Sequence, residues 1–336
     1  MSEPCRQPPE PARESRAGES CCQPAGPARE SRAGESCCQP AEPARESRAT
    51  IGPNNGTHLI EQVTVPAQTF AMGDAHGDGA RPDGETPVHE VRLDAFSIDA
   101  TAVTVADFTR FVAATGYRTE AETFGYSAVF HLFLAADDAD VLGRPPQTPW
   151  WLGVRGADWA HPFGPRSTVD GAEDHPVVHV SWNDARAYCA WTGRRLPTEA
   201  EWECAARGGL PGRRYPWGDD LDAGRCNIWQ GTFPAVNTRE DGYAATAPVR
   251  TYAPNAYGLW QPVGNVWEWC ADWFDPGWYA RSPVDNPTGP GSGPGRVLRG
   301  GSYLCHDSYC NRYRNSARSS NTPDSSMGNA GFRTVA

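Results

Sequence analysis

The residues best suited to chemistry are two cysteines near the end of the chain, Cys305 and Cys310. Two thiols at this spacing can meet at one metal ion across a turn. Zinc favours four ligands, and no third or fourth ligand is obvious, although His306 stands beside the first cysteine. Two thiolates suit Cu(I), a soft ion that leaves room for a substrate thiolate. The spacing is equally compatible with two buried cysteines that pack as small hydrophobic side chains.

Two loops carry the oxygen-rich residues that hard cations prefer. Residues 227–231 and 240–243 offer side-chain and carbonyl oxygens of the kind that Ca²⁺ binds. Residues 261–269 offer a second set around a glycine turn. Neither set has the spacing of an EF-hand. Because Asp and Asn also cap their own turns, the pattern alone leaves calcium binding and turn formation open.

The charged residues exclude several kinds of enzyme. All 30 basic residues are arginines and none is a lysine. A Schiff-base lysine and the phosphate-binding lysines of P-loop proteins and kinases are therefore excluded. The formal net charge of −11 argues against nucleic acid as a general partner, because counterion release needs a basic surface.

The chain contains no apolar run long enough to span a membrane, and its polar, proline-rich start does not resemble a signal peptide. We therefore expect no membrane partner and a cytoplasmic, reducing location, in which structural disulfides are rare.

The first 50 residues contain a repeat, since the block Pro-Ala-Arg-Glu-Ser-Arg-Ala begins at Pro11, Pro27 and Pro43. Two copies are followed by Cys-Cys pairs, which could bind a soft metal. This segment has almost no aromatic or β-branched residues and cannot bury enough surface to offset its ordering entropy. We predict a disordered tail over residues 1–59 and one catalytic domain over residues 60–336.

Few regular elements are expected to position these residues. Alternating apolar and polar residues predict strands over residues 63–73 and 90–98. Capping residues and glycine stops predict helices over residues 105–115, 183–192 and about 199–207. Beyond Gly208 the chain is mostly turns and short aromatic stretches. The expected fold is therefore an irregular α+β domain with little regular secondary structure.

Motifs along residues 60–336 resemble the formylglycine-generating enzymes, or sulfatase-modifying factors, of the aerobic, actinobacterial type. Marks shared across the wider superfamily are Phe70-Ala-Met-Gly-Asp74, Pro87-Val-His-Glu-Val91, His175-Pro-Val-Val-His-Val-Ser-Trp182, Gly193-Arg-Arg-Leu-Pro-Thr-Glu-Ala-Glu-Trp-Glu203, Pro216-Trp-Gly218 and Gly264-Asn-Val-Trp-Glu-Trp269. The run from Gly300 to Arg333, with Cys305 and Cys310, is more diagnostic, because superfamily members with other activities generally lack both cysteines.

The resemblance implies a fold related to C-type lectins and an oxidase that acts on unfolded sulfatase chains. It implies that Cys305 and Cys310 hold Cu(I), and that O₂ and a thiol reductant serve to convert the cysteine of a Cys-x-Pro-x-Arg motif, through a thioaldehyde, into Cα-formylglycine. Ser302, Tyr309 and Trp267 would line the pocket for oxygen and the substrate cysteine. Arg312 and Arg314 are further candidates there, or else support the fold through hydrogen bonds.

The resemblance also implies two Ca²⁺ sites and a monomeric protein. The first site would use Asn227, the Ile228 carbonyl, Asp241 and the Tyr243 carbonyl. The second would use Gln261, the carbonyls of Gly264 and Val266, and Glu268. Gln261 departs from the shorter Asn or Asp that is usual in the family, which places the second site in question.

Three alternatives compete with this interpretation. An iron-dependent sulfoxide synthase on the same fold would need an additional helical domain with histidine ligands, whereas residues 1–59 contain only His58. A lectin-like binding module has no need of two thiols beside a Gly-Gly-Ser turn. A structural zinc protein would need more clustered ligands.

Overall fold

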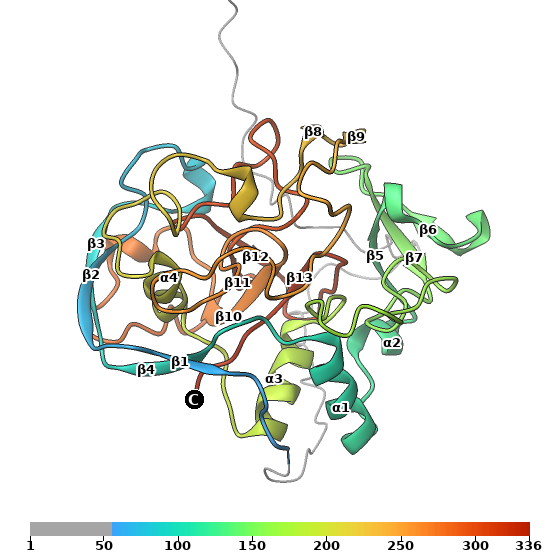
Figure 1. The fold of residues 1–336 in the computed structure, drawn as a ribbon, viewed down its shortest axis with the longest axis horizontal. Coiled ribbons are helices and arrows are strands. Elements are labelled where there is room, and N and C mark those ends of the chain that lie inside the picture. Colours follow the sequence, from blue (N-terminus) through green and yellow to red (C-terminus); the bar gives the residue numbers. More distant parts are fainter. Residues whose placement is uncertain (1–55) are drawn as a thin grey trace, which may run out of the picture.

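The computed structural model describes residues 56–336 of the chain (Figure 1). The predicted tail over residues 1–59 therefore lies outside the described residues except for its last four. Within the described range there are four α-helices, α1 (Val105–Thr115), α2 (Glu120–Phe124), α3 (Trp182–Thr192) and α4 (Glu199–Arg207). None of the helices between residues 56 and 336 is both long and apolar enough to cross a lipid bilayer.

The centre of the molecule is a four-stranded sheet in the order β12-β11-β10-β13. Its strands are β10 (Trp267–Trp273), β11 (Arg296–Arg299), β12 (Arg318–Asn321) and β13 (Ala330–Gly331). β10, β11 and β12 pair antiparallel, whereas β13 pairs parallel with β10. This sheet positions the residues between β11 and β12, which include both cysteines of interest.

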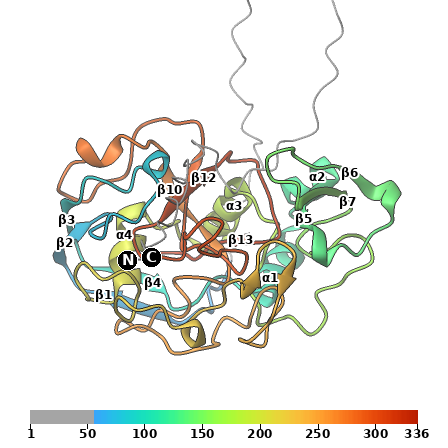
Figure 2. The ribbon, with the colours of Figure 1, turned by 90° about the horizontal axis from the view of Figure 1, so that it is seen from above.

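Smaller sheets lie around the central one. They are β1 (Gln62–Val65) with β4 (Phe96–Asp99), β2 (Gln68–Met72) with β3 (His89–Leu93), β8 (Gly231–Thr232) with β9 (Val236–Asn237), and β5 (Tyr126–Phe130), β7 (Trp151–Arg155) and β6 (Val141–Gly143) in the order β5-β7-β6. Figures 1 and 2 place the β2–β3 pair and the β5-β7-β6 sheet at opposite ends of the long axis. Long loops connect these sheets, so the predicted irregular α+β class is confirmed.

All four helices begin and end on local signals. Each has a capping box, in which a Thr or Ser side chain accepts from the N3 backbone and an N3 carboxylate accepts from the cap backbone. The caps are Thr104, Thr119, Ser181 and Thr198. Each helix is followed by a glycine in the left-handed conformation, which suits a residue without a Cβ. The three predicted helices are confirmed, while α2 was not predicted.

The two predicted strands are each interrupted. Residues 63–73 divide into parts of β1 and β2 at Pro66, which has no backbone N–H to donate. Residues 90–98 divide into β3 and β4 at Asp94 and Ala95. The four pieces pair as β1–β4 and β2–β3, so the predicted pair of strands is a long hairpin broken once on each side.

The core is unusually rich in aromatic and charged side chains. Phe108 and Phe111 of α1 are fully buried, as the periodicity predicts, and pack against Tyr188 of α3. Arginines are buried as well, since Arg299 and Arg318 of the central sheet, and Arg333 just after β13, form ion pairs with glutamates. Paired in this way, the charges avoid the penalty of an isolated buried ion.

Candidate functional site

The loop between β11 and β12 begins with two glycines that bring the chain close to its neighbours. Gly300 and Gly301 have φ values of 92° and 70°. A Cβ on Gly300 would lie 2.7 Å from the Pro262 carbonyl oxygen, and one on Gly301 would lie 2.4 Å from the Arg312 carbonyl oxygen. Only glycine fits both the backbone conformation and the space. The glycine pair thus places Ser302 against the rest of the loop.

Two successive turns return the chain so that Cys305 and Cys310 line one small cavity. The Cys305 N–H donates to the Ser302 carbonyl at 2.9 Å, and the Cys310 N–H donates to the His306 carbonyl at 2.9 Å. Cys305 is buried and Cys310 is half-buried. Neither cysteine takes part in a disulfide. The prediction that the two thiols share a site agrees with this geometry.

Ser302 lies directly beneath the first thiol. Its backbone N–H donates to the Cys305 Sγ at 3.4 Å. Its Oγ accepts from the Asn329 side-chain amide at 2.9 Å. The Asn329 Oδ1 is buried without a hydrogen-bond partner. Asn329 lines the cavity too, although only its place in the diagnostic run pointed to it in the sequence.

Trp267, another predicted residue, lines the same cavity from β10. Its backbone N–H donates to the Asn329 carbonyl at 2.8 Å, where β10 runs beside β13. Trp267 is buried, so its ring forms a fixed wall. The central sheet therefore positions Trp267 and Asn329 together.

A buried histidine holds the segment that precedes Asn329. The His179 backbone N–H donates to the Met327 carbonyl at 3.0 Å. Its ring Nε2 lies 2.7 Å from the Pro162 carbonyl oxygen, which can only accept, so Nε2 carries the proton. The ring Nδ1 therefore accepts from the Ser127 Oγ at 2.7 Å, and Ser127 in turn accepts from the Ser326 Oγ at 2.7 Å. Burial lowers the pKa of His179 to about 4, consistent with this neutral tautomer.

Aromatic rings form the outer wall of the cavity. Tyr309, the last predicted pocket residue, stacks on Phe233 with ring centres 4.3 Å apart. The Trp150 ring packs edge-on against both, at 5.0 Å from Tyr309 and 5.2 Å from Phe233. All three rings are partly exposed beside Cys310. Trp150 and Phe233 were not predicted, because they lie far from the cysteines in sequence and belong to no recognised motif.

The first predicted calcium set lies in a loop that two hydrogen bonds close. The Asn227 side-chain amide donates to the Ala245 carbonyl at 2.8 Å, and the Asp241 N–H donates to the Gln230 side-chain oxygen at 2.9 Å. The Asp241 Oδ1 accepts from the Tyr243 N–H at 3.0 Å, while Oδ2 is buried without a hydrogen-bond partner. Burial raises the pKa of this carboxyl group.

Comparison with known proteins places the chain in a family. A model of the sulfatase-modifying factor enzyme 1-like domain matches residues 47–336. The chain belongs to this family. A formylglycine-generating enzyme of Streptomyces coelicolor is 67% identical over 275 residues, which cover 81% of this chain and 88% of that protein. One from Thermomonospora curvata is 55% identical over 280 residues, or 82% of this chain and 92% of that protein.

The sulfatase-modifying factor family also contains proteins named as inactive. A mouse protein named inactive C-alpha-formylglycine-generating enzyme 2 is 45% identical over 274 residues, which cover 81% of this chain and 84% of that protein. The solved structure of PvdO from Pseudomonas aeruginosa has a TM-score of 0.62 at 23% identity and covers 85% of this chain and 98% of that one. The predicted fold related to C-type lectins is confirmed, whereas activity must be argued from the site.

Two arginines that the family resemblance suggested for the pocket belong to the frame instead. Arg312 donates to both oxygens of Asp83 at 2.6 and 2.7 Å. Arg314 donates to both oxygens of Glu85 at 2.8 and 2.7 Å. All four side chains are buried, and neither arginine lines the cysteine cavity. These pairs attach the cysteine loop to residues 81–85, which agrees with the fold-supporting interpretation.

The possible metal ligands around the cysteine cavity suit a soft metal ion. Within residues 56–336, no group of three or more His, Cys, Asp or Glu side chains is placed to hold a metal. The His306 Nδ1 lies 2.8 Å from the Ser308 Oγ, and His306 does not line the cavity. Two thiols without further charged or imidazole ligands suit Cu(I) better than zinc, which favours four ligands.

The two predicted calcium sets differ in how well they fit the ion. In the first, the buried Asp241 Oδ2 is an open anionic acceptor that a hard cation would satisfy. In the second, Arg333 donates to both oxygens of Glu268 at 2.6 and 2.7 Å, and the Trp202 indole donates at 2.7 Å. A calcium ion on this carboxylate would face a buried guanidinium, which repels it. Only the Gln261 Oε1 is left without a partner, so the second set fits less well.

Proposed function

We propose that the protein is a copper-dependent oxidase that uses O₂ to convert the cysteine of a Cys-x-Pro-x-Arg motif in sulfatase polypeptides into Cα-formylglycine. The observation that carries this proposal is the placement of Cys305 and Cys310 on one cavity without a disulfide between them. Relatives that are 67% and 55% identical bear the name formylglycine-generating enzyme. Bound copper would supply the redox chemistry that activates O₂, which no amino-acid side chain supplies by itself.

The chain's own residues would prepare the thiols for this role. The Ser302 N–H donates to the Cys305 Sγ at 3.4 Å and so helps to fix the position of the sulfur that would bind the metal. The Asn329 amide holds the Ser302 hydroxyl at 2.9 Å, so the turn that carries Cys305 has a fixed position. Cys310, half-buried at the edge of the cavity, is the thiol nearer to solvent. A substrate thiol would therefore approach from its side.

The small size of the cavity supports the proposal that the substrate is unfolded. At about 10 Å³ it has room for a group no larger than about one water molecule. A single thiol-bearing side chain can reach it, but a folded surface cannot. The partly exposed rings of Trp150, Phe233 and Tyr309 offer an apolar surface to an extended peptide. Their packing also limits the access of water to the thiols.

The net reaction is balanced by an external reductant. The substrate Cβ is oxidised from thiol to thioaldehyde, and water then replaces sulfur to leave the aldehyde and hydrogen sulfide. This oxidation removes two electrons, whereas reduction of O₂ to water takes four. Two molecules of a thiol reductant supply the other two electrons and become a disulfide. Each O₂ gives two water molecules, hydrolysis of the thioaldehyde consumes one, and one water molecule therefore remains in the net reaction.

The decisive test is mass spectrometry of a Cys-x-Pro-x-Arg peptide after incubation with the protein, Cu(I), O₂ and a thiol reductant. The expected product has lost sulfur and gained an aldehyde oxygen, and it reacts with a hydrazide probe. A peptide with Ser in place of Cys is the matched control and should remain unchanged. No conversion in any copper state would instead favour a binding module, in line with the inactive relatives.

We also propose that Ca²⁺ binds at Asn227, Ile228, Asp241 and Tyr243. The support is the buried Asp241 Oδ2, which lacks a hydrogen-bond partner in a loop that is otherwise closed by hydrogen bonds. Oxygen donors of this kind suit a hard cation. The ion would stabilise this loop rather than enter the chemistry at the thiols.

A further inference from the structure

One cavity in residues 56–336 is separate from the cysteines. It has a volume of about 720 Å³, within the range of sites for organic ligands. It shares no lining residue with the cavity of Cys305 and Cys310. Its walls come from the turn between β3 and β4, one side of α3, the start of α4, β10 and residues 286–288. Segments from across the chain therefore meet around it.

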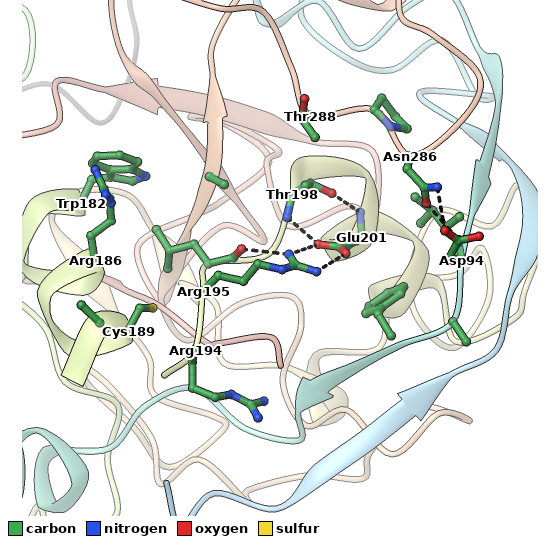
Figure 3. A pocket seen from close by; sticks show the side chains of 17 residues that line it. Asp94, Trp182, Arg186, Cys189, Arg194, Arg195, Thr198, Glu201, Asn286 and Thr288 are labelled. Carbon is green, nitrogen blue, oxygen red and sulfur yellow. Dashed lines mark hydrogen bonds and ion pairs between the residues drawn. The ribbon is translucent and has the colours of Figure 1, made fainter. Parts of the chain in front are cut away.

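The charges around this cavity are unevenly satisfied (Figure 3). Arg195, between its two ends, donates to both oxygens of Glu201 at 2.7 Å and is neutralised by that carboxylate. Arg194 donates to Gln62 and Thr334. Arg186 is exposed and has neither a hydrogen bond nor an ion pair to any residue in the described part of the chain. Among these three arginines, only its guanidinium is uncommitted.

The Arg186 side chain is nevertheless held in place. Its guanidinium lies 5.0 Å from the centre of the Trp182 ring, within the range of a cation–π contact that favours this position of the side chain. The Trp182 ring is fixed in turn, since its indole N–H donates to the Cys270 carbonyl at 2.9 Å. An oriented guanidinium presents parallel donors that match the two oxygens of a carboxylate.

The opposite end of the cavity has the other sign. Asp94 accepts from the Asn286 side-chain amide at 3.0 Å, and Figure 3 shows this pair across the cavity from Trp182 and Arg186. Between the two ends the lining includes apolar side chains such as Leu93, Phe96 and Leu196. A second negative group at the other end of a ligand would be repelled by the Asp94 carboxylate. The charge pattern therefore favours one anionic group at the Arg186 end.

We propose that this cavity binds an organic monocarboxylate with an apolar body, and that Arg186 holds the carboxylate. The apolar body lies along the surface formed by Leu93, Phe96 and Leu196. This site is independent of the oxidase proposed above, because it shares no residue with the cysteine cavity.

The test uses three probes of equal chain length, octanoate, octanedioate and octan-1-ol, in competition with the fluorescent anion 8-anilinonaphthalene-1-sulfonate on the full chain. Octanoate is expected to bind about two- to fivefold more tightly than octan-1-ol, because an ion pair with an exposed arginine contributes up to about 1 kcal/mol. Octanedioate is expected to bind more weakly than octanoate. Equal binding of all three probes, or no binding, would overturn the proposal.

Two variants locate the site. Arg186→Gln should remove the preference for octanoate over octan-1-ol, whereas Arg144→Gln, which changes an exposed arginine outside the cavity, should preserve it. Ala190→Trp places a large ring in the cavity and should prevent binding of the fluorescent probe. Conversion of the sulfatase peptide should be unchanged in all three variants. Octanoate that binds Arg186→Gln as tightly as the parent protein would refute the assignment.

Discussion

The buried arginines of the central sheet are held in ion pairs, whereas the cysteine cavity contains a buried acceptor without a partner. Beside the sheet, Arg333 donates to both oxygens of Glu268 in β10 and to the carbonyls of Asp99 and Trp260. Arg318 donates to both oxygens of Glu199 at 2.7 Å. In the cavity, the Asn329 Oδ1 is buried without a partner. Ion pairs with carboxylates hold a frame, whereas acceptors without partners remain for ligands and chemistry.

The two regions also differ in whether their residues are expected to serve stability or activity. A buried ion pair resists change because removal of one partner leaves an uncompensated charge. Arg312 and Arg314 attach the cysteine loop to this frame, so its two thiols need not contribute to stability. Substitutions in the two regions should therefore have different consequences, and four experiments test that difference.

The largest effect is expected at the cysteines. Cys305→Ala or Cys310→Ala should abolish aldehyde formation on a Cys-x-Pro-x-Arg peptide, because each removes one of the two sulfurs proposed to hold copper. Unfolding in urea should occur at nearly the same midpoint as in the parent protein. Cys204→Ala, which removes a buried thiol outside the cavity, is the control and should keep its turnover. Normal turnover in either cavity variant would refute the copper site.

The second largest effect is expected on stability, at the buried ion pairs of the frame. Arg333→Met leaves Glu268 buried without its counter-charge and should lower the free energy of unfolding by about 3–5 kcal/mol. Urea titration followed by tryptophan fluorescence measures this change. Arg92→Met breaks an exposed pair with Asp285 and should have little effect. Similar losses in both variants would contradict the view that the buried pairs hold the frame.

A third effect concerns His179, which connects the frame to the cavity. Its pKa is about 4 in the folded protein, against about 6.5 in the unfolded chain. The unfolded state thus binds the proton more readily between these values, so the histidine's contribution to stability is complete above pH ~6.5 and lost as the pH falls towards ~4. The predicted loss is up to about 3 kcal/mol over this window.

His179→Gln should reduce that pH dependence relative to the parent protein. Subtraction of the two stability curves removes the contributions of Asp184 and Asp272, whose raised folded pKa values act in the opposite direction. The same variant should lower turnover by about 10–100-fold, the usual effect of losing a group that orients a site. Identical pH profiles for the two proteins would exclude a neutral buried His179.

The smallest effect is expected at the proposed calcium loop. Calcium at about 100 times its dissociation constant should stabilise the protein by about 2.7 kcal/mol, measured as a rise in Tm relative to EDTA. Asp241→Asn should eliminate this rise. Glu240→Gln, a change at the exposed neighbouring carboxylate, is the matched control and should retain it. A rise that persists in Asp241→Asn would place the ion elsewhere.

Several features were predictable because their signals are local. The capping boxes at Thr104, Ser181 and Thr198 place donor and acceptor within three residues, so they can be read without knowledge of the fold. The cysteine spacing and its glycine turn are equally local. The family, the fold class and the three long helices were therefore predicted correctly. The boundary at residue 60, the cytoplasmic location, the monomeric state and the absence of nucleic-acid partners stay predictions.

What only the tertiary structure decided involves residues that are far apart in the chain. The sequence by itself identified Cys305 and Cys310 as a pair, but gave no indication that Trp150 and Phe233 form the wall beside them. Nor could it join Ser127, His179 and Ser326 into one chain of hydrogen bonds. Such contacts depend on how separate sheets pack, and packing of distant segments has no local periodicity or spacing to reveal it. The sequence therefore determined which groups are proposed to react, and the fold determined what surrounds them.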